Sequence, residues 1–305
     1  MNSQATVARP RVVWAEIAVI GMALIWGVNY SVIKYGTGVV PPLAYNSVRV
    51  LLGATCLLAI ALVWGGKAPS RRDALTIIAL GALGNGVYQI FFAEGISRTR
   101  AGEAALVVGA SPALMAIIGG MRGVERVTTR GLIGIALSIF GVGLVVLGRA
   151  AAGGGAPGGS LIGDLLVLAG SVCWAVYTIL LIPYTKRLSG WYVLAYSMIG
   201  GSIVLGIVGA RSIASVNWLQ LSATTWAAVF YSGLGALVLA YILWYRGVKV
   251  LGPTRTALYG NIQPLIALLV AWVTLHEVPT AWQVVGALTI VGGVLLTRAP
   301  ATEQS

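Results

Sequence analysis

Long apolar stretches separated by short polar gaps run through the whole chain. A helix that crosses a membrane needs about 20 mainly apolar residues. Ten stretches are long enough, and they cover residues 14–35, 42–65, 74–96, 101–120, 130–148, 161–183, 191–210, 223–245, 255–275 and 280–298. The pattern therefore predicts an all-α polytopic membrane protein with ten transmembrane helices.

The composition points to a lipid bilayer as the surroundings of the chain. Of its 305 residues, 58% are hydrophobic and only 9% are charged, whereas a soluble protein carries about 25% charged residues. The net charge is +12, which in a soluble chain would suggest binding to nucleic acid. Here the basic residues stand mostly in the short gaps between apolar stretches, where they determine membrane topology. We therefore expect a bilayer partner and no nucleic acid.

The distribution of Lys and Arg predicts the orientation of the chain. If the N-terminus lies in the cytoplasm, fourteen of the twenty basic residues lie on the inner side and five on the outer side, while Arg49 lies within a span. Cytoplasmic loops of membrane proteins carry an excess of Lys and Arg. Both termini are therefore predicted to be cytoplasmic.

The two halves of the chain resemble each other. A shift of 152 residues aligns Gly81 with Gly233, Pro112 with Pro264, and Glu125 with Glu277. Nearer the start of each half the offset is 148, which aligns Trp26 with Trp174. Because each half has five spans, an odd number, the halves must have opposite orientations in the membrane. Inverted repeats of this kind are typical of secondary transporters, whose substrate site lies near the midplane between the repeats.

The repeat predicts how the chain is divided. A glycine-rich segment, residues 150–160, separates the two sets of five spans and is expected to be a linker. The predicted parts are an N-terminal cytoplasmic tail (1–13), a first five-helix repeat (14–149), the linker, a second five-helix repeat (161–298) and a C-terminal cytoplasmic tail (299–305).

These features resemble the EamA-type branch of the drug/metabolite transporter superfamily. The resemblance covers nearly the whole chain and depends on the ten spans, on the Trp-Gly-x-Asn sequence from Trp26 to Asn29, and on a pattern of Pro, Glu and two Gly residues that occurs twice. The two copies are Pro112, Glu125, Gly134, Gly141 and Pro264, Glu277, Gly286, Gly293. The aromatic content of the central spans looks like that of bacterial aromatic amino-acid exporters. The resemblance implies a multi-pass protein of the bacterial inner membrane.

Aromatic and polar residues near the middle of several spans are the candidates for substrate binding. Trp26 lies near the midplane of the first span, and Asn29 and Tyr30 follow on the same helix face. Because polar groups at this depth are costly toward lipid, such a face is expected to line the bundle interior. The predicted binding residues are Trp26, Asn29, Tyr30, Tyr88, Gln89, Phe92, Trp174, Tyr177, Tyr259, Asn261 and Gln263. Helix packing with internal hydrogen bonds is the alternative interpretation.

Proline interrupts two spans at matching places. Pro112 and Pro264 are predicted helix breaks or hinges, because proline removes a backbone donor from the helix. A simple packing kink is the alternative. A separate aromatic group, Tyr241, Trp244 and Tyr245, lies toward the cytoplasmic end of the eighth span. We expect these three residues to form part of an interfacial aromatic belt, with an inner gate as the alternative.

The ionisable residues limit the class of substrate. Glu16, Glu94, Glu103 and Asp164 all lie near span ends, so no carboxylate is expected at mid-membrane. This favours a neutral or zwitterionic solute over a cationic drug that exchanges with a proton. Arg49 lies about seven residues into the second span and is expected to extend to the outer interface. The alternative is that Arg49 attracts a carboxylate from the outer vestibule.

The predicted function is export of small metabolites, foremost aromatic or other neutral amino acids, by alternating access around a central cavity. Planar cationic drugs, nucleobases and sugars remain alternative substrates. A membrane-embedded enzyme is a remote alternative, because the chain has one histidine, His276, and lacks the common catalytic motifs. No cofactor, metal site or enzyme activity is therefore predicted. The small-residue helix faces leave open a homo-oligomer.

Overall fold

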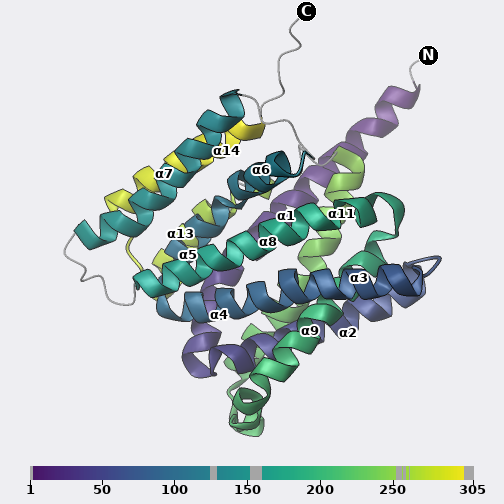
Figure 1. The fold of residues 1–305 in the computed structure, drawn as a ribbon, viewed down its shortest axis with the longest axis horizontal. Coiled ribbons are helices and arrows are strands. Elements are labelled where there is room, and N and C mark those ends of the chain that lie inside the picture. Colours follow the sequence, from purple (N-terminus) through teal and green to yellow (C-terminus); the bar gives the residue numbers. More distant parts are fainter. Residues whose placement is uncertain are drawn as a thin grey trace, which may run out of the picture.

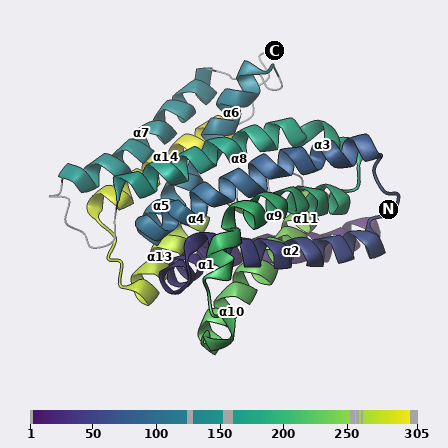
Figure 2. The same ribbon diagram turned by 60° about the horizontal axis from the view of Figure 1, so that its bottom comes forward.

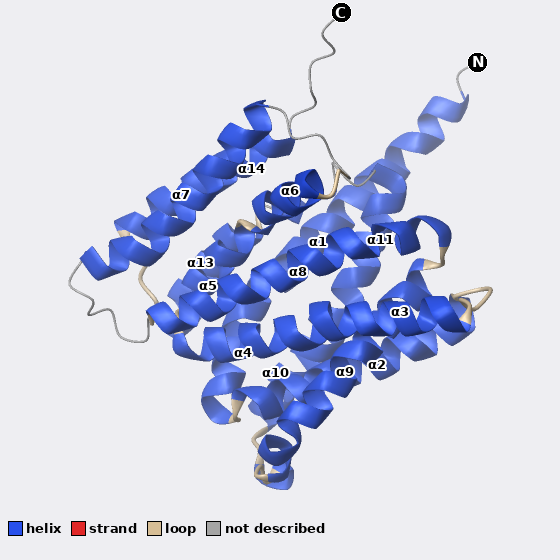
Figure 3. Cartoon of the chain, in the orientation of Figure 1, coloured by secondary structure: helices blue, strands red, loops and turns tan. Residues whose placement is uncertain are grey.

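Every regular segment in the described part of the chain is helical, as Figure 3 shows. The computed structural model describes residues 3–123, 129–151, 160–251, 256, 259–260 and 262–298. In the first half the elements are α1 (Ser3–Val39), α2 (Pro42–Trp64), α3 (Arg71–Gly81), η1 (Ala82–Val87), α4 (Tyr88–Arg98), α5 (Ala101–Gly109), α6 (Ser111–Met121) and α7 (Thr129–Ala151). In the second half they are α8 (Leu161–Arg187), α9 (Gly190–Ala214), η2 (Trp218–Gln220), α10 (Ala223–Phe230), η3 (Tyr231–Leu239), α11 (Ala240–Leu251), α13 (Gln263–Leu275) and α14 (Ala281–Arg298).

The lengths of the helices agree with a polytopic membrane protein. Among the described residues, eight helical stretches are long and apolar enough to cross a membrane, and they lie at the first eight predicted spans. Two shorter apolar helices, Gln263–Leu275 and Ala281–Leu296, lie at the ninth and tenth. The all-α polytopic membrane fold is therefore confirmed for the described residues, while the count of ten stays a prediction.

Large apolar side chains cover the outside of the bundle. Leu62, Val63, Ile207, Phe140 and Val273 are all well exposed. A soluble protein rarely exposes contiguous apolar surface on this scale. In a bilayer these side chains would contact lipid, so their exposure is what a multi-pass membrane protein requires.

The helices of the two halves pack against one another in matching pairs. Figures 1 and 2 both show α7 beside α14, and α2 lies against α9. Likewise α1 contacts α11, and α8 contacts α4. In the two halves α1 corresponds to α8, and α4 corresponds to α11. The α1–α11 contact of one half with the other is therefore matched by the α8–α4 contact.

Two wide helical turns occur at equivalent places. The π-helical segment η1 (Ala82–Val87) lies between α3 and α4, and η3 (Tyr231–Leu239) lies between α10 and α11. The 152-residue shift places residues 82–87 on 234–239, which lie inside η3. Both halves therefore depart from α-helical geometry at the same point. π-Helical segments are rare and frequently occur at functional sites.

Glycine contacts repeat the same symmetry. A Cβ atom at Gly81 would lie 2.1 Å from the carbonyl oxygen of Ser197, and one at Gly233 would lie 3.0 Å from the carbonyl oxygen of Arg49. Gly81 and Gly233 are aligned by the shift of 152, and Arg49 and Ser197 are aligned by the shift of 148. The same contact therefore occurs once in each direction between the halves, which supports the predicted inverted repeat.

The prolines stand at the first turns of new helices. Helix α5 ends at Gly109, and Pro112 lies in the first turn of α6, which begins at Ser111. Pro264 likewise lies in the first turn of α13. Proline is tolerated there because the first backbone N–H groups of a helix have no partner within the helix.

Helices α7 and α14 approach closely through glycine. A Cβ atom at Gly293 would lie 2.5 Å from the Gly134 carbonyl oxygen, and one at Gly141 would lie 3.0 Å from the Gly286 carbonyl oxygen. Small residues allow backbones in a membrane to come this near. These glycines therefore serve helix packing within the chain.

This packing predicts different outcomes for neighbouring glycines. Gly293→Ala should lower the stability of the protein in detergent by about 1–3 kcal/mol, because the added methyl group meets backbone atoms. The matched control is Gly292→Ala, since a Cβ atom there meets nothing within 4 Å. It should be neutral or stabilising by up to about 1 kcal/mol. Equal thermal-unfolding midpoints for the two variants would contradict the α7–α14 contact.

Candidate functional site

A buried arginine lies at the centre of a polar network between helices. Arg49 of α2 is only 1% exposed, although it lies about 10 Å along the helix from Pro42. Its Nε donates to Asn46 Oδ1 at 2.6 Å, and a terminal nitrogen donates to Gln89 Oε1 at 2.7 Å. A charged side chain at such depth costs roughly 3 kcal/mol on insertion scales. The hydrogen bonds from Arg49 to Asn46 and Gln89 must therefore offset the cost of burying this charge.

The two amides that hold Arg49 are themselves fixed. Asn46 Nδ2 donates to the backbone oxygen of Gln89 at 2.7 Å, so its Oδ1 is turned toward the guanidinium. Both Asn46 and Gln89 are buried. The arrangement links α2 to α4 and presents a positive charge in a fixed position.

A row of aromatic rings begins beside this network and continues into the second half. Tyr30 packs edge-to-face on Phe92 at 5.8 Å, and Phe92 stacks on Tyr88 at 5.6 Å between ring centroids. Tyr88 contacts Trp174 at 5.4 Å, and Trp174 contacts Tyr177 at 5.2 Å. These spacings are typical of favourable aromatic pairs. The structure thus brings five predicted binding residues together, from α1, α4 and α8.

Trp26 belongs to a neighbouring aromatic group. Its indole N–H donates to the Ala236 carbonyl oxygen at 2.9 Å. Its ring lies 5.5 Å from Tyr241 and 6.0 Å from Trp244. Asn29, the next predicted residue along α1, accepts a hydrogen bond from Ser232 at 2.9 Å. The structure therefore places Trp26 and Asn29 against the π-helical segment of the second half and the helix that follows it.

Tyr241 connects the aromatic groups to the arginine. Tyr241 packs on Trp26 and against the apolar cluster that contains Val50 of α2, the residue after Arg49. The Gln89 side chain of α4 binds Arg49, and Tyr88 of α4 contacts Trp174 of α8. Residues of α2, α4, α8 and α11 therefore converge on one region, and two of these helices come from each half.

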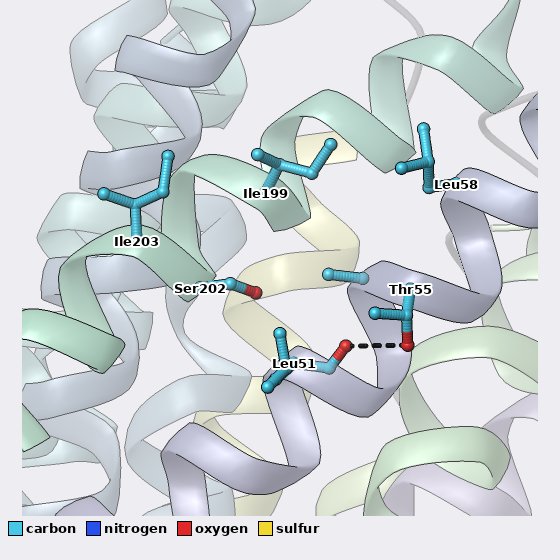
Figure 4. A pocket seen from close by; sticks show the side chains of 7 residues that line it. Leu51, Thr55, Leu58, Ile199, Ser202 and Ile203 are labelled. Carbon is cyan, nitrogen blue, oxygen red and sulfur yellow. Dashed lines mark hydrogen bonds between the residues drawn. The ribbon is translucent and has the colours of Figure 1, made fainter. Parts of the chain in front are cut away.

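The last three predicted binding residues stand near the start of α13 in the sequence. Tyr259 and Gln263 are half-buried near the start of α13, and Asn261 lies outside the described residues. A pocket of about 260 Å³ lies between α2 and α9 (Figure 4). Its walls include Leu51, Thr55 and Ile203, which are exposed on the apolar surface. This pocket contains none of the predicted binding residues.

A second polar group joins the two halves at one end of the bundle. The Glu277 carboxylate accepts hydrogen bonds from the N–H groups of Ala101 and Gly102 at 3.2 and 3.4 Å. It thereby caps the N-terminus of α5, where a negative charge is favourable. Arg100 lies 3.9 Å from Glu277 and donates to the Val278 carbonyl oxygen at 2.8 Å.

Buried carboxylates belong to the same polar group as Glu277. The Gln283 amide donates to Glu103 at 3.0 Å, and the Thr99 hydroxyl is within hydrogen-bonding distance of both Glu103 and Asp164. Each of these contacts, except the one from Thr99 to Glu103, joins one half to the other. At the opposite end of the bundle, Arg187 of α8 binds Asp73 of α3. Both ends therefore hold polar contacts between the halves.

The structure corrects one prediction. Arg49 does not extend to the outer interface: it is buried, because Asn46 and Gln89 provide acceptors inside the bundle. Tyr241 and Trp244 pack on Trp26 of α1, and their place in an interfacial belt or an inner gate stays a prediction. Asn46 was missed, although Asn46 and Arg49 stand at i and i+3 in an apolar span, a spacing that places them on one helix face.

The fold and the buried polar centre define a class of protein, a multi-pass helical membrane protein with a charged site between its helices. Comparison with known proteins makes the class specific. The EamA-like transporter family matches residues 13–147 and again residues 161–299. The chain belongs to this family. Membership indicates a membrane transporter of small metabolites rather than an enzyme.

Individual relatives extend over nearly the full chain. The "Uncharacterized transporter YyaM" of Bacillus subtilis is 26% identical over 290 residues, which cover 92% of each protein. The "Probable terminal-alkyne amino-acid exporter" of Streptantibioticus cattleyicolor is 27% identical over 289 residues, 94% of each. The structure is similar to a solved crystal structure, with a TM-score of 0.65 and a sequence identity of 21%. The match covers 92% of this chain and 95% of the chain in the crystal structure, so the two proteins share the fold.

The polar group around Glu277 predicts a pH-dependent stability. Burial raises the pKa of the Glu277 carboxyl above its ordinary value of 4.5, and the backbone N–H groups, Arg100 and Lys34 offset this only in part. A raised pKa in the folded state means that the contribution of Glu277 is greatest when it is protonated. That contribution should fall as the pH rises from about 4.5 through the raised pKa. Glu277→Gln should flatten this part of the curve of melting temperature against pH; an unchanged slope would contradict the assignment.

Proposed function

We propose that this transporter exports small neutral amino acids, aromatic ones foremost, across the bacterial inner membrane. The row of rings from Tyr30 to Tyr177 is the observation that carries the proposal. Aromatic faces stack on flat apolar groups, and amide and hydroxyl groups beside them bind polar groups by hydrogen bonds. The name of the Streptantibioticus cattleyicolor relative, a probable amino-acid exporter, agrees with this substrate class.

The mechanism we propose is alternating access between two inverted five-helix repeats, residues 14–149 and 161–298, with both termini in the cytoplasm. The matched π-helical segments and the reciprocal contacts of Gly81 and Gly233 support the repeat. The aromatic row crosses from α4 to α8, so a bound ring would contact both halves. The polar contacts at the two ends, Glu277 with α5 and Asp73 with Arg187, would then open in turn.

We also propose functions for the two prolines and for the aromatic residues of α11 in this mechanism. Pro112 and Pro264 start the α6 and α13 segments, where a change of helix direction needs no hydrogen bond to be broken at the proline. The proposed gate consists of Tyr241, Trp244 and Tyr245 on α11. Tyr241 and Trp244 contact Trp26, and Tyr245 stacks on Trp191 at 5.8 Å between ring centroids. Movement of α11 would carry these rings away from the row and open the inner side.

Transport of labelled phenylalanine and tryptophan into proteoliposomes tests the proposal. Uptake that follows the substrate gradient without a pH gradient would support a facilitated amino-acid exporter. Uptake that requires a pH gradient would support the same substrate with proton coupling. No uptake by folded protein in either condition, together with transport of a nucleobase, a sugar or a planar cation, would contradict the aromatic amino-acid assignment.

Removal of one ring from the row should weaken transport selectively. Trp174→Ala should reduce uptake of phenylalanine about tenfold at equal expression, because the ring contacts both Tyr88 and Tyr177. Trp174→Phe should retain most of the uptake. The matched control is Trp272→Ala, which removes an indole that is 49% exposed on α13. Equal uptake by Trp174→Ala and Trp272→Ala would remove Trp174 from the binding site.

A further inference from the structure

The charge of Arg49 has no ionic partner in the described part of the protein. The ion pairs there join Arg98 to Glu94, Arg100 to Glu277, and Arg187 to Asp73. The partners of Arg49 are two neutral amides, Asn46 and Gln89, and the nearby phenols of Tyr45, Tyr88 and Tyr241. Amide oxygens satisfy hydrogen-bond donors, but they leave the positive charge uncompensated.

An uncompensated cation inside a membrane helix bundle is unusual. Ionisable residues in transmembrane helices are rare and commonly mark substrate or ion pathways. If the function of Arg49 were structural only, an apolar residue or an internal ion pair would fold at lower cost. The network instead holds the guanidinium with two of its five N–H groups in the hydrogen bonds to Asn46 and Gln89. This is the arrangement expected of a receptor for an anionic group.

The position of Arg49 relative to the aromatic row suggests what carries the anion. Gln89, which binds Arg49, directly follows Tyr88, which belongs to the row. Tyr241 packs against the apolar cluster that contains Val50, the residue after Arg49. A ligand with a carboxylate at Arg49 would therefore place an attached ring or alkyl group among Tyr88, Trp174 and Tyr177.

We propose that Arg49 binds the carboxylate of the transported substrate, and that the substrate is an amphiphilic monocarboxylate. This inference rests on the proposed function for the amino-acid class, but it makes a narrower claim about the head group. Planar lipophilic cations, which the aromatic rings alone would accept by cation–π attraction, are repelled by the fixed charge. Asn46 and Gln89 orient the guanidinium and are positioning residues.

A set of ligands that differ only in the head group tests the claim. Phenylalanine and 3-phenylpropionate have a carboxylate, whereas phenylalaninamide and phenethylamine do not. Binding is measured by competition against labelled phenylalanine, and independently by the shift of melting temperature in detergent that each ligand produces. The wild type should bind both carboxylates at least about tenfold more tightly than the amide and the amine. Equal binding of phenylalanine and phenylalaninamide would overturn the proposal.

Two variants separate recognition from folding. Arg49→Gln removes the charge and should abolish the preference for carboxylates. Gln89→Glu keeps the size of the side chain and supplies an internal counter-ion, so it should fold even if Arg49→Gln does not. Gln89→Glu should raise the melting temperature and weaken carboxylate binding about tenfold or more, because the new carboxylate occupies the guanidinium. Unchanged carboxylate affinity in folded Gln89→Glu would overturn the proposal.

The same experiment distinguishes failure of this inference from failure of the proposed function. Arg211→Gln, which removes an exposed arginine near the end of α9, is the control for loss of one positive charge and should behave as wild type. If aromatic amino acids do not bind but aliphatic carboxylates bind and lose affinity in Gln89→Glu, the aromatic assignment fails and Arg49 remains the receptor. If aromatic amides and acids are bound and transported equally, the aromatic assignment holds and the inference about Arg49 fails.

Discussion

The close contact between glycine and the opposite backbone is the constraint on which the arrangement depends. Gly81 lies against Ser197 of α9, and Gly233 lies against Arg49 of α2, so no side chain separates these helices. In a membrane, where lipid is as apolar as the helix surface, association depends on such packing and on buried hydrogen bonds. Gly233 of the second half contacts the backbone of Arg49, while Asn46 and Gln89 of the first half bind its side chain. The position of the buried charge therefore depends on the packing of both halves.

This placement gives the proposed transport cycle a physical basis. The carboxylate receptor, Arg49 with Asn46 and Gln89, belongs to the first half, while Trp174 and Tyr177 belong to the second. A substrate that binds to both would join the halves at the site, and a free energy of binding that differs between two states can shift their populations. The polar contacts at the two ends of the bundle, around Glu277 and between Asp73 and Arg187, are the contacts that such a shift would break and form again.

Much of the fold could be predicted from the sequence, because a membrane span has a strong local signal. The lengths of the apolar stretches predicted the eight long helices, and the shift of 152 residues predicted the matching of Gly81 with Gly233. The site was predicted less completely. The aromatic residues near the middle of the spans predicted Tyr88, Phe92, Trp174 and Tyr177 as binding residues. Arg49 was expected to extend to the interface, because arginine usually does so. Its burial depends on acceptors from two helices, Asn46 on α2 and Gln89 on α4, whose approach is a tertiary contact. Similarly, the contact of Tyr241 with Trp26 joins helices that are far apart in the sequence, so no local pattern could predict it.

The most direct test of the account is a structure of the protein with 4-bromophenylalanine, located by the anomalous signal of bromine. We expect the carboxylate within hydrogen-bonding distance of the Arg49 guanidinium, and the bromine beside Trp174 and Tyr177. A ligand bound with its carboxylate away from Arg49, or seated in the α2–α9 pocket lined by Leu51 and Ile203, would contradict it.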